Sequence, residues 1–224
     1  MQCKGKNIYW NVTNFLPQNY GKLHILAFFV HKNKENMKHI AIFASGSGTN
    51  AENIARYFFQ SETVTVAVVL SNKKEAGVHA RMKALGIPTL TFGNAEFAEG
   101  APVLAVLKAY RVDFIVLAGF LAKIPPALLQ AYPSKIVNIH PALLPKFGGK
   151  GMYGMRVHEA VVAAGEKETG ITIHRIDENY DRGTTVFQAV CPVLPGETPE
   201  EVAAKVHALE YAHFPEVIEK LLAE

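Results

Sequence analysis

From residue 37 onward, short apolar runs alternate with segments of helical periodicity. The strand-like runs are residues 40–43, 64–70, 87–92, 113–117 and 136–139. Between them, apolar residues recur at helical spacing in residues 51–58, 76–85, 103–110 and 125–132. Buried strands that alternate with helices are typical of a parallel, doubly wound sheet with both faces covered. The sequence therefore predicts an α/β domain with a Rossmann-like sheet.

The last third of the chain has a different pattern. Residues 152–164 include a helix, but only residues 177–184 separate the strand-like segments 171–176 and 185–193. That connection is too short for a helical crossover, so it predicts an antiparallel strand pair. Residues 199–223 read as a long amphipathic C-terminal helix, with Thr198 as its N-cap. The predicted sheet is thus mostly parallel, with an antiparallel pair near its end.

The first 36 residues show no sustained periodicity. We expect residues 1–36 to be a leader or appendage outside the core, with Met37 as the biological start and residues 37–224 as a single domain. The alternative is an N-terminal arm that packs on the domain. N-terminal sequencing of the native protein distinguishes the two, because a mature start at Met1 contradicts the leader.

Composition narrows the class of protein. With 23 Lys and Arg against 20 Asp and Glu, the net charge of +3 does not favour a nucleic-acid partner. No apolar run reaches the roughly 18 residues of a membrane helix, so no membrane partner is expected. Cys3 and Cys191 form no CxxC pair, which favours a reducing cytoplasm and no metal site.

The first candidate site is the serine-glycine loop, residues 45–51, between the first strand and the first helix. Glycines permit a sharp turn there, and free N–H groups at a helix N-terminus attract phosphate. The spacing of Gly46, Gly48 and Ala51 also matches a dinucleotide fingerprint. However, the second strand is followed by Lys73 and Lys74 rather than by the acidic residue that holds a ribose. A phosphomonoester is favoured over a nicotinamide cofactor or a plain tight turn.

The second candidate pairs Asn138 with His140 on the fifth strand, immediately before Pro141. Side chains two apart on a strand face the same side, and the carboxyl edge of such a sheet is where ligands bind. An amide donor beside an imidazole suits acyl transfer, since one stabilises an oxyanion and the other moves a proton. The alternative for His140 alone is a hydrogen-bonded core histidine.

A third cluster, Asp177, Glu178 and Asp181, lies in the connection between the two late strands. A solvated turn or a calcium loop is the alternative, but no later bidentate acid follows. An aspartate placed near His140 would favour the charged form of its imidazole. The sequence does not show that proximity.

These motifs together resemble the formyltetrahydrofolate-dependent transformylases, over about residues 38–222. The signature N-x-H-P-x-L-L-P at residues 138–145 carries the resemblance, together with the serine-glycine loop and Asp181. The resemblance implies one formyltransferase domain over residues 37–224 and transfer of a formyl group from 10-formyltetrahydrofolate to the amine of 5-phosphoribosylglycinamide. It implies no metal, and it leaves monomer and homodimer open.

The resemblance also implies roles for particular residues. Asn138 would hold the formyl oxygen, and His140 would be the general acid, kept protonated by Asp181. The residues expected to contact the ribonucleotide are Gly48, Thr49, Asn50, Pro141, His207 and Glu210. The residues expected to contact the folate, besides Asn138, are Phe120, Leu121, Ala122, Lys123 and Ile124. Many relatives carry an arginine where this chain has Ala122 followed by Lys123.

Residues 146–154 form a longer loop than is usual in the family, with four glycines. It is either a mobile lid or a variable surface loop. We expect His158 to be structural or to support the residues that contact the substrate, and His174 to be a packed core histidine. The competing functions are another user of the same formyl donor, either a hydrolase or a sugar-amine formyltransferase, and a non-catalytic nucleotide-binding module.

Overall fold

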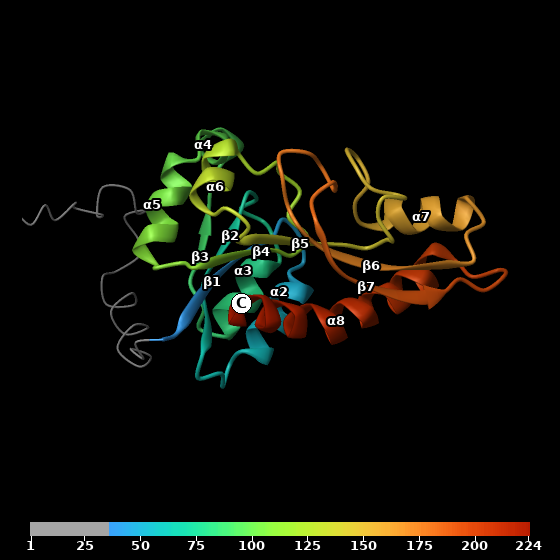
Figure 1. Ribbon diagram of the computed structural model, residues 1–224, viewed down its shortest axis with the longest axis horizontal. Helices are drawn as coiled ribbons and strands as arrows, with labels where there is room; N and C mark the ends of the chain where they lie inside the picture. Colours follow the sequence, from blue (N-terminus) through green and yellow to red (C-terminus); the bar gives the residue numbers. More distant parts are fainter. Residues whose placement is uncertain (1–35) are drawn as a thin grey trace, which may run out of the picture. The chain divides into compact units, whose positions relative to one another are not determined.

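In the computed structural model, residues 36–224 are described, and their strands form one seven-stranded sheet (Figure 1). The strands are β1 (Lys38–Phe43), β2 (Val64–Ser71), β3 (Thr89–Thr91), β4 (Phe114–Leu117), β5 (Ile136–His140), β6 (Glu168–Arg175) and β7 (Thr185–Pro192). Their order across the sheet is β3-β2-β1-β4-β5-β6-β7. The first five run parallel, whereas β6 is antiparallel to both β5 and β7. The predicted Rossmann-like, mostly parallel fold class is confirmed.

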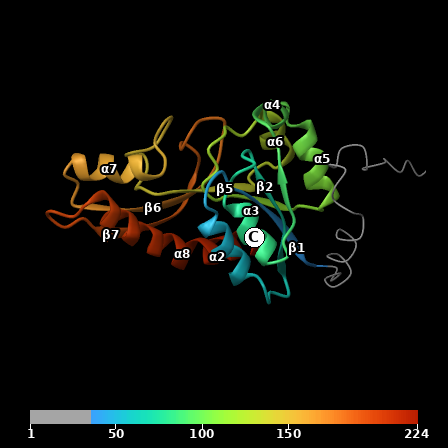
Figure 2. The same cartoon turned by 180° about the vertical axis from the view of Figure 1, so that it is seen from behind.

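Helices cover both faces of the parallel part of the sheet (Figures 1 and 2). One group contains α2 (Thr49–Tyr57), α3 (Val78–Ala84) and α8 (Pro199–Ala223), and the other contains α4 (Asn94–Glu99), α5 (Ala101–Ala109) and α6 (Pro126–Ala131). Both faces of the sheet need a covering layer because alternate side chains of a strand such as β1 point to opposite faces. Ile40 and Ile42 belong to the core shared with α2 and α8, whereas the ring of Phe43 lies 6.0 Å from that of Phe97 on α4. The remaining helix, α7 (Met155–Ala163), packs against α8.

The serine that follows β1 ties three strand ends together at the centre of the sheet. The Ser45 hydroxyl donates to Asn72 Oδ1 at 2.6 Å and accepts from the backbone N–H of Leu121 at 2.9 Å. Its own N–H donates to the carbonyl of Gly119. These bonds lie where chain connections from β1 and β4 diverge, and open α/β sheets bind their ligands at such a point.

Helix α8 has the predicted start and an unusual interior. The N–H of Glu201 donates to Thr198 Oγ1 at 3.2 Å, while Glu201 Oε2 accepts from the N–H of Thr198 at 2.8 Å. Pro215 lies inside the helix and has no N–H to donate to the carbonyl four residues earlier. That carbonyl, of Tyr211, instead accepts from Asn53 Nδ2 on α2 at 2.9 Å. The proline thus frees an acceptor that docks α2 onto α8.

Several element boundaries differ from the prediction. Helix α4 was not predicted, because Phe97 is its only buried residue and no apolar period marks it. Strand β6 begins at Glu168 rather than residue 171, because its first residues pair in register with the end of β7 despite a polar sequence. Helix α3 and strand β3 are shorter than residues 76–85 and 87–92.

The predicted leader, residues 1–36, lies outside the described residues except for Asn36, so it stays a prediction. None of the helices among residues 36–224 combines the length and the apolar character needed to cross a membrane.

Candidate active site

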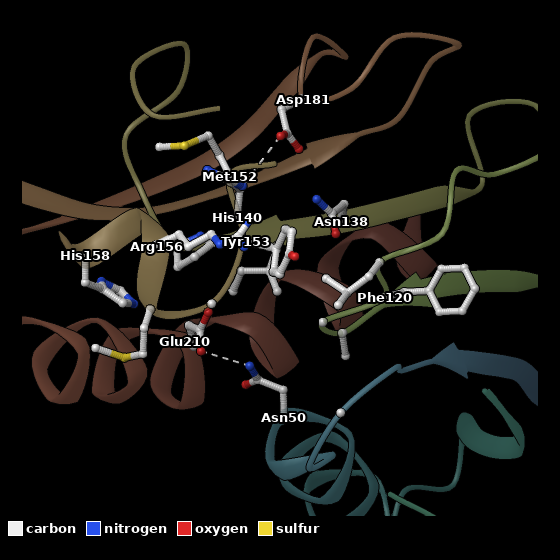
Figure 3. Close-up of a pocket in the computed structure, with 18 of the residues that line it drawn as sticks. Asn50, Phe120, Asn138, His140, Met152, Tyr153, Arg156, His158, Asp181 and Glu210 are labelled. Atoms are coloured by element: carbon white, nitrogen blue, oxygen red, sulfur yellow. Dashed lines mark hydrogen bonds and ion pairs between the residues drawn. The ribbon is translucent and has the colours of Figure 1, made fainter. Parts of the chain in front are cut away.

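A cavity of about 640 Å³ opens at the carboxyl edge of the central strands (Figure 3). The serine-glycine loop forms one wall, and the chain after β4 forms another. The end of β5, the 146–154 loop, the β6–β7 connection and α8 complete it. A volume of this size is typical of small-molecule sites. Every segment named as a candidate from sequence therefore contributes to one cavity.

Asn138 and His140 both line this cavity, and Pro141 follows them. His140 is buried, whereas Asn138 is half-buried. Their common orientation follows from the alternation of side chains along β5. The prediction that they project together is confirmed.

Asp181 reaches the same point from the β6–β7 connection. Its Oδ2 atom lies 3.7 Å from His140 Nδ1 and accepts the N–H of Gly149 at 2.8 Å. Its Oδ1 atom lies 3.7 Å from His174 Nε2. The carboxylate is therefore placed between two imidazoles and is held there by the 146–154 loop.

The second nitrogen of His140 is already engaged. His140 Nε2 lies 2.8 Å from the carbonyl oxygen of Phe147. A carbonyl oxygen only accepts, so Nε2 carries a proton and donates it to that bond. The nitrogen left to exchange a proton is Nδ1, which faces Asp181.

The serine-glycine loop has the geometry of an anion site. The first backbone hydrogen bond of α2 runs from the N–H of Glu52 to the carbonyl of Gly48. The preceding N–H groups, of Thr49, Asn50 and Ala51, have no partner within the helix. Gly48 has a φ of +78°, and a Cβ built there would lie 2.5 Å from Val78 Cβ. Glycine is required at this position for both reasons.

Beside the serine-glycine loop, Glu210 on α8 forms hydrogen bonds with two neighbouring side chains. Its carboxylate is 4% exposed; Oε2 accepts from Asn50 Nδ2 at 2.9 Å and bonds His207 Nδ1 at 2.8 Å. The hydrogen bond from Glu210 raises the pKa of His207. Asn50 Oδ1 is buried and has no hydrogen-bond partner among the described residues. This corner therefore offers a carboxylate, an imidazole and a free amide oxygen.

Residues 120–124, which follow β4, lie only partly at the cavity. Phe120 and Leu121 line it, but Ala122, Lys123 and Ile124 are not among its lining residues. Ile124 is buried, and Lys123 Nζ lies 6.0 Å from the centre of the Tyr180 ring. The folate contacts expected from residues 120–124 stay a prediction.

Two histidines that the sequence predicts to be structural, His158 and His174, lie at or beside this cavity. His158 on α7 lines the cavity and is buried, and burial lowers its pKa. His174 is buried as expected, but its Nε2 also bonds Asn138 Nδ2 at 3.1 Å. Its contact with Asn138 follows from the β5–β6 register, which pairs the two residues, and no local sequence pattern indicates it. Among residues 36–224, no group of three or more His, Cys, Asp and Glu is arranged to hold a metal ion.

A family model described as formyl transferase matches residues 38–218, and the chain belongs to that family. The phosphoribosylglycinamide formyltransferase of Bacillus subtilis is 36% identical over 191 residues, which cover 83% of this chain and 95% of that protein. The chloroplastic phosphoribosylglycinamide formyltransferase of Arabidopsis thaliana is 41% identical over 193 residues, which cover 84% of this chain. The match spans 66% of the length of the plant protein.

Solved structures support the same family. The crystal structure of phosphoribosylglycinamide formyltransferase from Bacillus halodurans superposes with a TM-score of 0.76 at 37% identity, covering 84% of this chain and 96% of that one. The family predicted from the residues is confirmed.

Proposed function

We propose that this chain transfers a formyl group from 10-formyltetrahydrofolate to the amine of 5-phosphoribosylglycinamide in purine biosynthesis. The observation that carries the proposal is the meeting of Asn138, His140 and Asp181 in one cavity with the serine-glycine loop. An acyl-transfer centre and an anion site at opposite ends of a cavity suit a phosphorylated amine as acceptor. The names of the relatives point to the same acceptor.

The acceptor is held between α2 and α8. The N–H groups of Thr49, Asn50 and Ala51 bind its phosphate, because they lack helical partners and the helix dipole favours an anion. Glu210 accepts from its hydroxyl groups, and the free Oδ1 of Asn50 offers a second acceptor. Phe120 and the half-exposed Leu121 supply apolar surface for the donor's ring system.

10-Formyltetrahydrofolate supplies the formyl group and receives a proton on the nitrogen that releases it. Asn138 Nδ2 donates to the formyl oxygen as it gains negative charge. His140 gives the proton from Nδ1, while Nε2 stays bonded to the Phe147 carbonyl. Asp181 stabilises the imidazolium and relays the proton of the attacking amine through water.

The test is formyl transfer by purified protein, followed by release of tetrahydrofolate with and without the ribonucleotide. We expect release to require the ribonucleotide and to fall by about 10²- to 10⁴-fold in His140→Ala. Release of the same size without an acceptor would assign a hydrolase instead. Transfer to an amino sugar but not to the ribonucleotide would assign a sugar-amine formyltransferase.

A further inference from the structure

One buried side chain beside the reacting centre has no role in the proposed reaction. His174 lies on β6 directly opposite Asn138 in the antiparallel β5–β6 register. Residues opposite each other in such a pair point to the same face of the sheet. With 1% of its surface exposed, His174 is shielded from a substrate in the cavity. It therefore acts through its neighbours.

The contact between the two side chains favours the neutral form of His174. Its Nε2 atom lies 3.1 Å from Asn138 Nδ2. An amide nitrogen only donates, so Nε2 must accept and carry no proton. The imidazole is then neutral, with its single proton on Nδ1, a buried atom for which the described residues supply no hydrogen-bond partner. Burial acts in the same direction, because it lowers the pKa of His174 and outweighs the opposing pull of Asp181.

We propose that neutral His174 is the positioning residue that sets the rotamer of the Asn138 amide for formyl transfer. This inference rests on the proposed function. With one N–H committed to His174, the second N–H of Asn138 has a fixed direction and is available to the formyl oxygen. Without an acceptor on β6, the amide can turn over and present Oδ1, which repels an oxygen that is becoming negative.

Proton uptake by His174 would undo this arrangement. A protonated Nε2 can no longer accept from Asn138, and the nearest anion is Asp181 Oδ1 at 3.7 Å. The other charged groups that act on the ring are His140, which lowers its pKa, and Asp177, which raises it. An imidazolium at position 174 would also compete with His140 for Asp181. Neutral His174 thus leaves Asp181 to His140.

Two variants separate positioning from simple packing. His174→Leu removes the acceptor, whereas His174→Gln offers an amide oxygen to Asn138 Nδ2 and cannot be protonated near neutral pH. We expect kcat of the Leu variant to fall about 10- to 100-fold, because misplaced catalytic groups cost rates of this order. KM for both substrates should change by less than about threefold, since His174 is shielded from the cavity. The Gln variant should recover most of the kcat.

NMR spectroscopy tests the contact between His174 and Asn138 independently of enzyme activity. In ¹⁵N NMR spectra of the wild-type protein at pH 7.5, we expect His174 Nε2 to be unprotonated and Nδ1 to be protonated. The Asn138 side-chain amide signals should move in the Leu variant and return toward their wild-type positions in the Gln variant. Urea unfolding of both variants provides the control for stability.

Three results would overturn the proposal: a proton on Nε2 at pH 7.5, wild-type kcat in a folded Leu variant, or a folded Gln variant as slow as the Leu variant. Failure of the proposed function has a different signature, because the wild-type protein would then not formylate the ribonucleotide. The NMR measurement would still report the His174–Asn138 contact.

Discussion

The buried carboxylate of Glu210 makes a specific titration testable at the scale of single residues. Its hydrogen bond raises the pKa of His207 above the ordinary histidine value. Glu210→Gln removes the negative charge, so the NMR titration midpoint of His207 should move to lower pH. KM for the ribonucleotide should rise about tenfold or more, since hydrogen bonds to charged groups contribute about 1.5–3 kcal/mol.

Glu219→Gln is the matched control on the same helix. Glu219 bonds Tyr57 at the surface and is not among the cavity residues. This variant should leave both the His207 titration and the KM unchanged. If Glu210→Gln also leaves the His207 midpoint in place, Glu210 does not set it.

Gly48 provides a second test at this scale. A side chain at Gly48 meets both a positive φ and the backbone of Val78. Gly48→Ala should therefore distort the serine-glycine loop and raise KM for the ribonucleotide about 10-fold or more, by loss of charge-assisted bonds to phosphate. KM for the folate donor should change much less.

Gly93→Ala is a suitable control for Gly48→Ala. Gly93 has a φ of −63°, and a Cβ there would meet only Glu96 Oε2, at 3.4 Å. Steady-state kinetics with the concentration of each substrate varied in turn measure both effects. Equal increases in both KM values for Gly48→Ala would contradict a role confined to the phosphate.

The limits of prediction also appear at the residue scale. Asn138 and His140 were predictable as a pair because their spacing on one strand fixes a common face. Spacing along the chain does not place Asp181 or His174 beside them, since those distances depend on the register of β5 with β6 and on the path of a loop. The family resemblance implied the contact of Asp181 with His140 but no role for His174. Alternation along a strand is local, whereas register is set by tertiary packing.

At the scale of elements, the N-terminus of α8 carries a reciprocal cap that can be tested alone. Thr198→Ala removes the hydroxyl that accepts from the N–H of Glu201. The free energy of unfolding should fall by about 1 kcal/mol, the typical effect of losing a helix N-cap. Thr198→Ser keeps the hydroxyl and should retain most of that stability in urea titrations. Equal losses in the two variants would show that the methyl group, rather than the cap, is responsible.

Helices and strands were predictable where a cap residue or a regular spacing of apolar residues marks them in the sequence. Helix α8 was predicted with its bounds, because Thr198 and the first-turn acids mark its start and apolar residues recur along it. Helix α4 was missed because a single buried phenylalanine leaves no period to detect. The first residues of β6 were missed because pairing with β7, rather than apolar character, makes them a strand.

For the whole molecule, two buried neutral histidines predict how stability depends on pH. Burial lowers the pKa values of His158 and His174. As pH falls below the ordinary histidine value of about 6.5, the unfolded chain takes up protons that the folded protein binds less readily. The contribution of neutral His158 and His174 to the free energy of unfolding is therefore complete above about pH 6.5 and is lost as pH falls below it.

Replacing one of them should reduce this dependence. In His158→Gln, the loss of stability between pH 6.5 and 5.5 should shrink by up to about 1.4 kcal/mol per pH unit, the limit for one proton. Urea unfolding at several pH values measures this change in the free energy of unfolding. His207→Gln should act in the opposite direction, because the raised pKa of His207 stabilises the folded protein at low pH. An unchanged slope in His158→Gln would mean that its ring titrates alike in both states.

The contact between Asn50 and Glu210 joins residues 160 positions apart in the chain, and the bond from Asn53 to the carbonyl freed by Pro215 spans a similar interval. During synthesis at about 5–20 residues per second, the serine-glycine loop is made roughly 8–32 seconds before its partner on α8. A nascent chain that lacks α8 has every backbone N–H of the proposed phosphate site but not the carboxylate that accepts a hydrogen bond from Asn50. The proposed acceptor site is therefore completed only after the long helix has emerged and docked.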